Sequence, residues 1–154
     1  MEKIASFRVD HDYILPGMYV SRIDGDVITF DLRTRRPNCG DYMDNITMHS
    51  VEHLMATLLR SGSLAERVIY FGPMGCQTGF YLLMRDVSPR EAYEETVRVL
   101  REAASFDGDM PGANRKECGN YQNLDLGCAK KECAEYLNAL VSRGFSPNYP
   151  EGDI

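Results

Sequence analysis

The most chemically informative residues are two histidines placed four positions apart, in the stretch His-Ser-Val-Glu-His at 49–53. The sequence has three histidines in all, so this pairing is informative. On a helix, residues i and i+4 lie one turn apart on the same face, so the imidazoles of His49 and His53 can reach one metal ion. Glu52 lies on nearly the same face, where a carboxylate can carry protons without binding the metal. The motif predicts a metal site with an adjacent acid–base group.

The third metal ligand is less obvious from the sequence. Two protein ligands are too few for a catalytic site, which usually has three and an open position. The candidates are His11 and the five cysteines. Cys118 is the preferred one, because it lies in a polar loop just before a predicted helix. Cys128 and Cys133 lie within that helix, where cysteines are more often buried small hydrophobes. Cys39 follows Pro-Asn in a loop, and its position fits a metal ligand and a non-ligand equally well.

Cys76 lies in a second unusual segment, the loop Gly-Pro-Met-Gly-Cys-Gln-Thr-Gly at 72–79. Its three glycines permit unusual backbone angles and the close approach of a ligand. A thiolate in a polar loop near a cation can act as a base or a nucleophile. Taken alone, the segment is better explained as a tight turn that contains a cysteine.

The composition restricts the classes to which the protein can belong. Its 154 residues correspond to about one domain. The net charge of −6 argues against nucleic-acid binding, which requires a basic surface. No apolar run approaches the roughly 20 residues of a membrane span, and the first residues lack the pattern of a signal peptide. The cysteines are odd in number and scattered, so we expect reduced thiols and a cytoplasmic protein with no membrane partner.

The elements that must position these residues can be predicted from apolar periodicity. Segment 46–60 has helical spacing, with Asn45 able to cap its start. A capping box with proline at the first helical position opens a second helix at Ser88, which runs to about 106. A third helix is predicted from about 124 to 143, where Gly144 ends it.

Strands are predicted at 27–33, and also at 3–9, 67–71 and 79–85. In 27–33 the residues alternate, with Ile28, Phe30 and Leu32 on one face and Asp31 and Arg33 on the other. Because few of the strands are joined by helices, we expect an α+β fold. This is a mostly antiparallel sheet with helices packed on one face, in a single domain over residues 1–154.

The motifs together resemble the S-ribosylhomocysteine lyase (LuxS) family. The resemblance rests on the His-Ser-Val-Glu-His motif, the loop 72–80 and Glu-Cys-Gly-Asn-Tyr at 117–121. The opening Ser-Phe-Arg-Val-Asp-His at 6–11 and Phe-Asp-Leu-Arg at 30–33 also match, as do the proline and asparagine at 37 and 38. These motifs occur in the family's order over nearly the whole chain, and five in order are highly specific.

The resemblance implies a role for each matching residue. The implied metal ligands are His49, His53 and Cys118, the acid–base residues Glu52 and Cys76, and the substrate-binding residues Ser6, His11 and Arg33. It implies one divalent ion per chain, with Fe(II) as the natural metal and Zn(II) or Co(II) able to substitute. It also implies a homodimer with active sites at the subunit interface. The implied substrate is S-ribosylhomocysteine, and the products are homocysteine and 4,5-dihydroxy-2,3-pentanedione, the precursor of the signal autoinducer-2.

Two other functions fit the metal motif. His-x-x-Glu-His is also the order found in one class of metallopeptidase, although the third ligand there is usually a carboxylate and Cys76 would have no role. A structural zinc domain would close all four positions with cysteine or histidine, and Cys118 with Cys39, Cys128 or Cys133 could supply the additional ligands.

Overall fold

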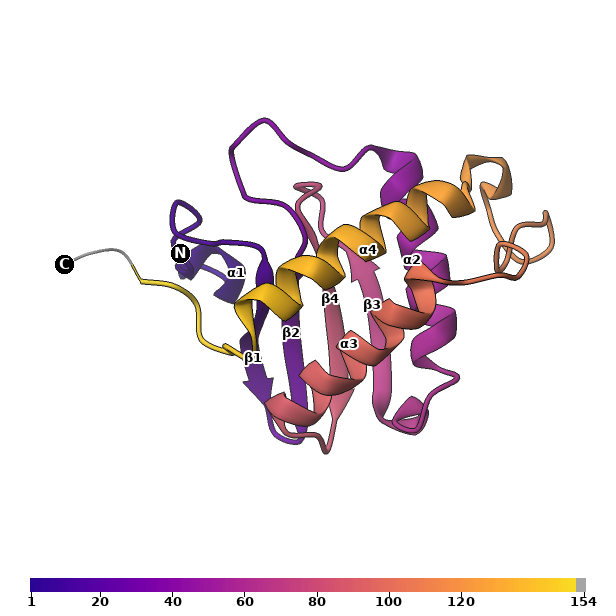
Figure 1. Ribbon diagram of the computed structural model, residues 1–154. Coiled ribbons are helices and arrows are strands. Elements are labelled where there is room, and N and C mark those ends of the chain that lie inside the picture. Colours follow the sequence, from indigo (N-terminus) through magenta and orange to yellow (C-terminus); the bar gives the residue numbers. More distant parts are fainter. Residues whose placement is uncertain (152–154) are drawn as a thin grey trace.

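The computed structural model describes residues 1–151, and within them four strands form one antiparallel sheet in the order β1-β2-β4-β3. The strands are β1 (Gly17–Asp24), β2 (Val27–Arg33), β3 (Val68–Pro73) and β4 (Gly79–Arg85). Helices α2 (Asn45–Leu59), α3 (Pro89–Ala104) and α4 (Leu126–Arg143) lie together over one face of the sheet (Figure 1). The predicted α+β class is therefore confirmed. None of the helices in the described part combines the length and apolar character needed to cross a bilayer.

The hydrophobic core lies between the sheet and the three long helices. Ile28, Phe30 and Leu32 of β2 are all buried in it, as their alternation predicts. Leu82 and Met84 of β4 lie beside them and are completely buried. Burying one such side chain stabilises the fold by about 1.5–3 kcal/mol, so this layer holds β2 and β4 rigidly under the helices.

The opposite face of the sheet carries polar residues, and two of them are unexpectedly buried. Asp31 and Arg33 of β2 are only 1% and 3% exposed. No long helix lies over them, so other segments must cover them. These segments are the turn at 76–78 and the C-terminal residues after α4, both of which contact this pair.

The N-terminal third differs most from the sequence-based prediction. Segment 3–9 was expected to be a strand, but it contains the short helix α1 (Ala5–Arg8). Strand β1 was not predicted, because a register shift between Val20 and Arg22 interrupts its alternation. The cap of α2 is Asp44 rather than Asn45, since the Asp44 carboxylate accepts the Thr47 N–H.

The loop that joins β2 to α2 is fastened at both ends. Arg35 donates to Glu132 of α4, with Nε 3.0 Å from Oε2, and also pairs with Asp41. The backbone N–H of Met43 donates to the Gln77 carbonyl at 3.0 Å. The loop is therefore held against the turn that carries Cys76, and the two segments together form the wall of a cavity.

Candidate active site

Helix α2 presents His49 and His53 side by side. Its apolar residues, among them Val51, Leu54 and Met55, are buried against the sheet and the other helices. The two histidines lie on the adjoining strip and are half-buried. Their ring centroids are 4.7 Å apart in an edge-to-face arrangement. The helical spacing therefore places both imidazoles at one point on the surface of α2, as the motif predicts.

Cys118 completes a group of three possible metal ligands. Its Sγ lies 3.4 Å from Nε2 of His49, and the ligand atoms of Cys118, His49 and His53 all lie within 4.8 Å of one another. Atoms bound to one tetrahedral ion at about 2.0–2.3 Å lie roughly 3.3–3.6 Å apart. The three side chains therefore fit one ion with a small inward movement. In the described part of the chain no fourth histidine, cysteine or carboxylate joins the group.

Backbone groups orient two of these ligands. The Pro111 carbonyl lies 2.8 Å from Nδ1 of His53, and a carbonyl can only accept, so Nδ1 carries the hydrogen and Nε2 is left for a metal. The Asn120 N–H lies 3.4 Å from Sγ of Cys118 and donates to it. Such outer contacts fix the tautomer and direction of a ligand before the ion binds.

Gly112 provides a test of this orientation. Its φ is +69°, and an added Cβ would lie 2.8 Å from Nδ1 of His53. We expect Gly112→Ala to turn the His53 ring and weaken metal binding by about 10–100-fold, the usual cost of losing an outer-shell contact. Gly25→Ala is the matched control, since Gly25 has φ +62° with nothing within 4 Å of an added Cβ. Competition with a chelator measures the affinities, and equal affinities in the two variants would exclude this role of Gly112.

The remaining cysteines and His11 lie outside the ligand group. Cys133 is buried, and burial raises the pKa of its thiol to about 12. Burial and then Asp125 raise the pKa of the Cys128 thiol. Both are therefore poor thiolate ligands. A structural zinc site lacks its fourth ligand among the described residues, and the carboxylate expected in a peptidase is replaced by a sulfur.

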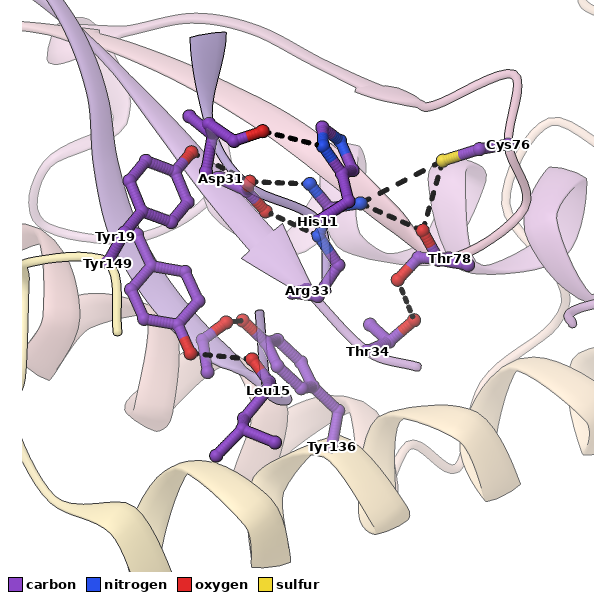
Figure 2. Close-up of polar contacts among 12 residues, drawn as sticks. His11, Leu15, Tyr19, Asp31, Arg33, Thr34, Cys76, Thr78, Tyr136 and Tyr149 are labelled. Carbon is purple, nitrogen blue, oxygen red and sulfur yellow. Dashed lines mark hydrogen bonds and ion pairs between the residues drawn. The ribbon is translucent and has the colours of Figure 1, made fainter. Parts of the chain in front are cut away.

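A second cluster forms where the β3–β4 turn meets the end of β2. Cys76 is exposed in this turn, and its Sγ lies 3.0 Å from Oγ1 of Thr78. Thr78 is buried and accepts a hydrogen bond of 2.8 Å from Nη1 of Arg33. The Thr78 hydroxyl is therefore free to donate its own hydrogen to the sulfur. The same Nη1 lies 3.8 Å from Sγ of Cys76 (Figure 2).

Arg33 is held in place by a buried ion pair. Its Nε and Nη2 donate to the two carboxylate oxygens of Asp31 at 3.1 and 2.6 Å. Burial alone lowers the pKa of the guanidinium, but Asp31, with a smaller contribution from Cys76, outweighs it and raises the pKa. Arg33 is therefore a fixed cation, and its Nη1 faces the sulfur of Cys76.

His11 belongs to the same cluster as Cys76, whereas Ser6 and Glu52 lie outside it. His11 and Cys76 line one open cavity of about 240 Å³, together with the loop residues Pro37, Asn38 and Tyr42. Nδ1 of His11 donates to the Val9 carbonyl at 2.9 Å, so Nε2 is the ring nitrogen left for another partner.

Ser6 lies instead in a hollow on the open face of the sheet, lined also by Tyr81 and Leu83. Glu52 is half-buried on α2, one residue before His53. The sequence-based candidates thus form a metal group with Glu52 on the same helix, a Cys76 group with Arg33 and His11, and Ser6 in its own hollow. Asp31 and Thr78 were not identified as site residues, although the alternation of β2 does place Asp31 on the same face as Arg33.

Comparison with known proteins adds an independent result. A family model described as S-Ribosylhomocysteinase (LuxS) matches residues 4–144. The S-ribosylhomocysteine lyase of Clostridium beijerinckii is 45% identical over 147 residues, which cover 92% of each chain. That of Borreliella burgdorferi is 42% identical over 146 residues, or 91% of this chain and 93% of the relative. The S-ribosylhomocysteine lyase of Desulfotalea psychrophila is 44% identical over 158 residues, which cover 97% of this chain and 99% of the relative.

Proposed function

Because the chain belongs to the S-ribosylhomocysteinase (LuxS) family, we propose that His49, His53 and Cys118 form the metal centre of an S-ribosylhomocysteine lyase. The reaction is a carbon–sulfur cleavage that gives homocysteine and 4,5-dihydroxy-2,3-pentanedione. The observation that carries the assignment of the centre is the group of three ligand atoms within 4.8 Å, with no fourth protein ligand in the described residues. An ion held by these three residues would keep one position open for substrate. We assign this activity to a single domain over residues 1–154.

The chemistry explains why proton carriers are needed beside the metal. The C–S bond at C5 of the ribose is not activated, so the sugar carbonyl must first move from C1 to C3. A bound divalent ion supplies the Lewis acid that polarises the sugar oxygens in these steps. Each movement of the carbonyl removes a proton from one carbon and returns one to its neighbour. We assign these transfers to the Cys76 thiolate and the Glu52 carboxylate.

The substrate-binding residues are proposed to be Ser6, His11 and Arg33. His11 lines the cavity that contains Cys76, and its Nε2 is available to form a hydrogen bond with a sugar hydroxyl. Arg33 directs Nη1 toward Cys76 and is fixed on its other side by Asp31. The guanidinium therefore supports both the sulfur and the substrate next to it.

The metal is proposed to be Fe(II), with Zn(II) or Co(II) able to substitute. Two imidazoles and one thiolate suit several divalent ions. The experiment that tests the function is the release of homocysteine from S-ribosylhomocysteine, measured anaerobically with Fe(II)-loaded protein. We expect thiol release that decays on exposure to air, whereas a peptide substrate should not be cleaved. Absence of thiol release from protein with a full equivalent of iron would exclude the function, and equal, air-stable turnover of the iron and zinc forms would count against iron.

A homodimer with active sites at the interface would explain the position of Ser6. Ser6 lies on the face of the sheet that the long helices leave open, near the exposed side chain of Tyr70. A second subunit against this face would bring another set of residues to each site. The cysteines are free, which agrees with a reducing compartment, and we propose a cytoplasmic location.

Mixing two inactive variants tests the shared site. We expect His49→Ala and His11→Ala to be inactive alone and to recover roughly a quarter of the activity after subunit exchange. Random pairing makes half of the dimers mixed. If the metal ligands and His11 of one site come from different chains, each mixed dimer retains one intact site of its two, which is a quarter of all sites. Mass spectrometry of isotope-labelled chains verifies the exchange. No recovery in a fully exchanged sample would place both residues in one chain's site.

A further inference from the structure

The residues that follow α4 turn back to the sheet and contact its open face. The Val20 N–H of β1 donates to the Pro147 carbonyl at 2.8 Å. Tyr149 stacks on Tyr19, with ring centroids 4.8 Å apart. Figure 1 shows this segment, in yellow, leaving the end of α4 and passing β1. Its attachment to β1 brings the hydroxyl of Tyr149 to the buried polar pair of β2.

Tyr149 donates a hydrogen bond to the carboxylate that holds Arg33. Its hydroxyl lies 2.8 Å from Oδ2 of Asp31, the same oxygen that accepts from Nη2 of Arg33 at 2.6 Å (Figure 2). Burial, and then the negative charge of Asp31, raise the pKa of Tyr149 well above its usual value. The phenol is therefore protonated at any working pH and can only act as a donor to Asp31.

The contacts continue from Asp31 to the reactive sulfur. Both carboxylate oxygens of Asp31 bind Arg33, and this two-point contact fixes the plane of the guanidinium. In that orientation Nη1 donates to Thr78 and points at Cys76. A rotation of the Asp31 carboxylate would therefore move the charge that lies 3.8 Å from Sγ.

We propose that Tyr149 is a positioning residue for Cys76, acting through Asp31 and Arg33. The inference rests on the proposed role of Cys76 in proton transfer. The match to the family model ends at residue 144, so Tyr149 lies outside the matched segment. In this chain the segment after α4 is thus part of the support of the active site, and not only a cover for the edge of the sheet.

Tyr149→Phe tests the proposal, because it removes the hydroxyl and keeps the ring that stacks on Tyr19. The matched control is Tyr93→Phe, which loses a partly buried hydroxyl bond of 3.0 Å to the Leu140 carbonyl, between α3 and α4. The measurements are kcat and KM of the anaerobic iron enzyme, metal content, melting temperature, and the rate of alkylation of Cys76 by iodoacetamide. Mass spectrometry of peptides separates Cys76 from Cys39, which is also exposed and serves as the internal reference.

We expect Tyr149→Phe to alkylate Cys76 several-fold more slowly relative to Cys39, since thiolates are the species that react. Its kcat should fall by about tenfold, which is less than the about 10²–10⁴-fold expected from removing an acid–base residue itself, with metal content unchanged. Tyr93→Phe should match the wild type in alkylation and kcat. A wild-type rate of Cys76 alkylation in Tyr149→Phe overturns the proposal, and so does an equal slowing in Tyr93→Phe.

A separate variant distinguishes failure of this inference from failure of the proposed function. Cys76→Ala is assayed in parallel, and normal turnover in it would remove Cys76 from the catalytic mechanism. The alkylation rates do not depend on turnover, so they still decide whether Tyr149 controls the reactivity of the sulfur.

Discussion

Replacing Cys118 with alanine should empty the metal centre and abolish homocysteine release while the fold is retained. Its Sγ is one of three ligand atoms within 4.8 Å, so its loss leaves two imidazoles on one helix face. Two ligands bind a divalent ion far more weakly than three. The loss of metal affinity should therefore exceed the loss of about 10–100-fold that follows removal of an outer-shell contact. We expect His49→Ala to have the same effect. Metal content after gentle chelation, together with circular dichroism, measures both outcomes.

The control for this experiment is another cysteine of the same chain. Cys128 lies at the start of α4 and is half-buried, as Cys118 is, but it does not belong to the ligand group. Cys128→Ala should therefore retain one equivalent of metal and normal turnover. If Cys118→Ala and His49→Ala both retained a full equivalent, the three-ligand site would be wrong.

The parts of the site that depend on local spacing could be predicted from the sequence. The pair His49 and His53 needs only a helix, and the apolar periodicity of 46–60 indicates one. Strand β2 was predicted with the bounds 27–33 that the structure shows, because its alternation is regular. The alternation also predicts that Asp31 and Arg33 share a face, but not that this face is covered.

The parts that depend on long-range packing could not be predicted in this way. Asp31 is joined to Tyr149, a residue 118 positions away, and no periodic pattern marks that contact. Segment 3–9 was expected to be extended, yet part of it forms the short helix α1, and the segment does not belong to the four-stranded sheet. Cys118 was chosen from the polarity of its loop, and its approach to His49 is a tertiary contact. Sequence reasoning thus supplies the candidates, and the fold decides which of them meet.

The Cys76→Ala variant should behave in the opposite way to Cys118→Ala, although both residues are cysteines in loops. Cys76 lies outside the ligand group, and its sulfur contacts Thr78 and Arg33 instead. The variant should therefore keep its metal, its fold and its binding of substrate. Turnover should fall by about 10²–10⁴-fold, the usual cost of removing one positioned acid or base. Anaerobic thiol release, metal analysis and substrate titration measure these three properties.

The fate of the substrate gives this prediction a second, independent readout. Because the sugar carbonyl must move in steps, a Cys76→Ala enzyme that lacks one proton carrier should accumulate a partly isomerised ketose, visible by NMR with ¹³C-labelled sugar. Glu52→Gln should also keep its metal and stall, at another step if the two residues serve different carbons. Cys39→Ala, a change at another exposed loop cysteine, should have no effect. The assignment of Cys76 to proton transfer is falsified if Cys76→Ala releases thiol at a near-normal rate, or if its main defect is loss of metal.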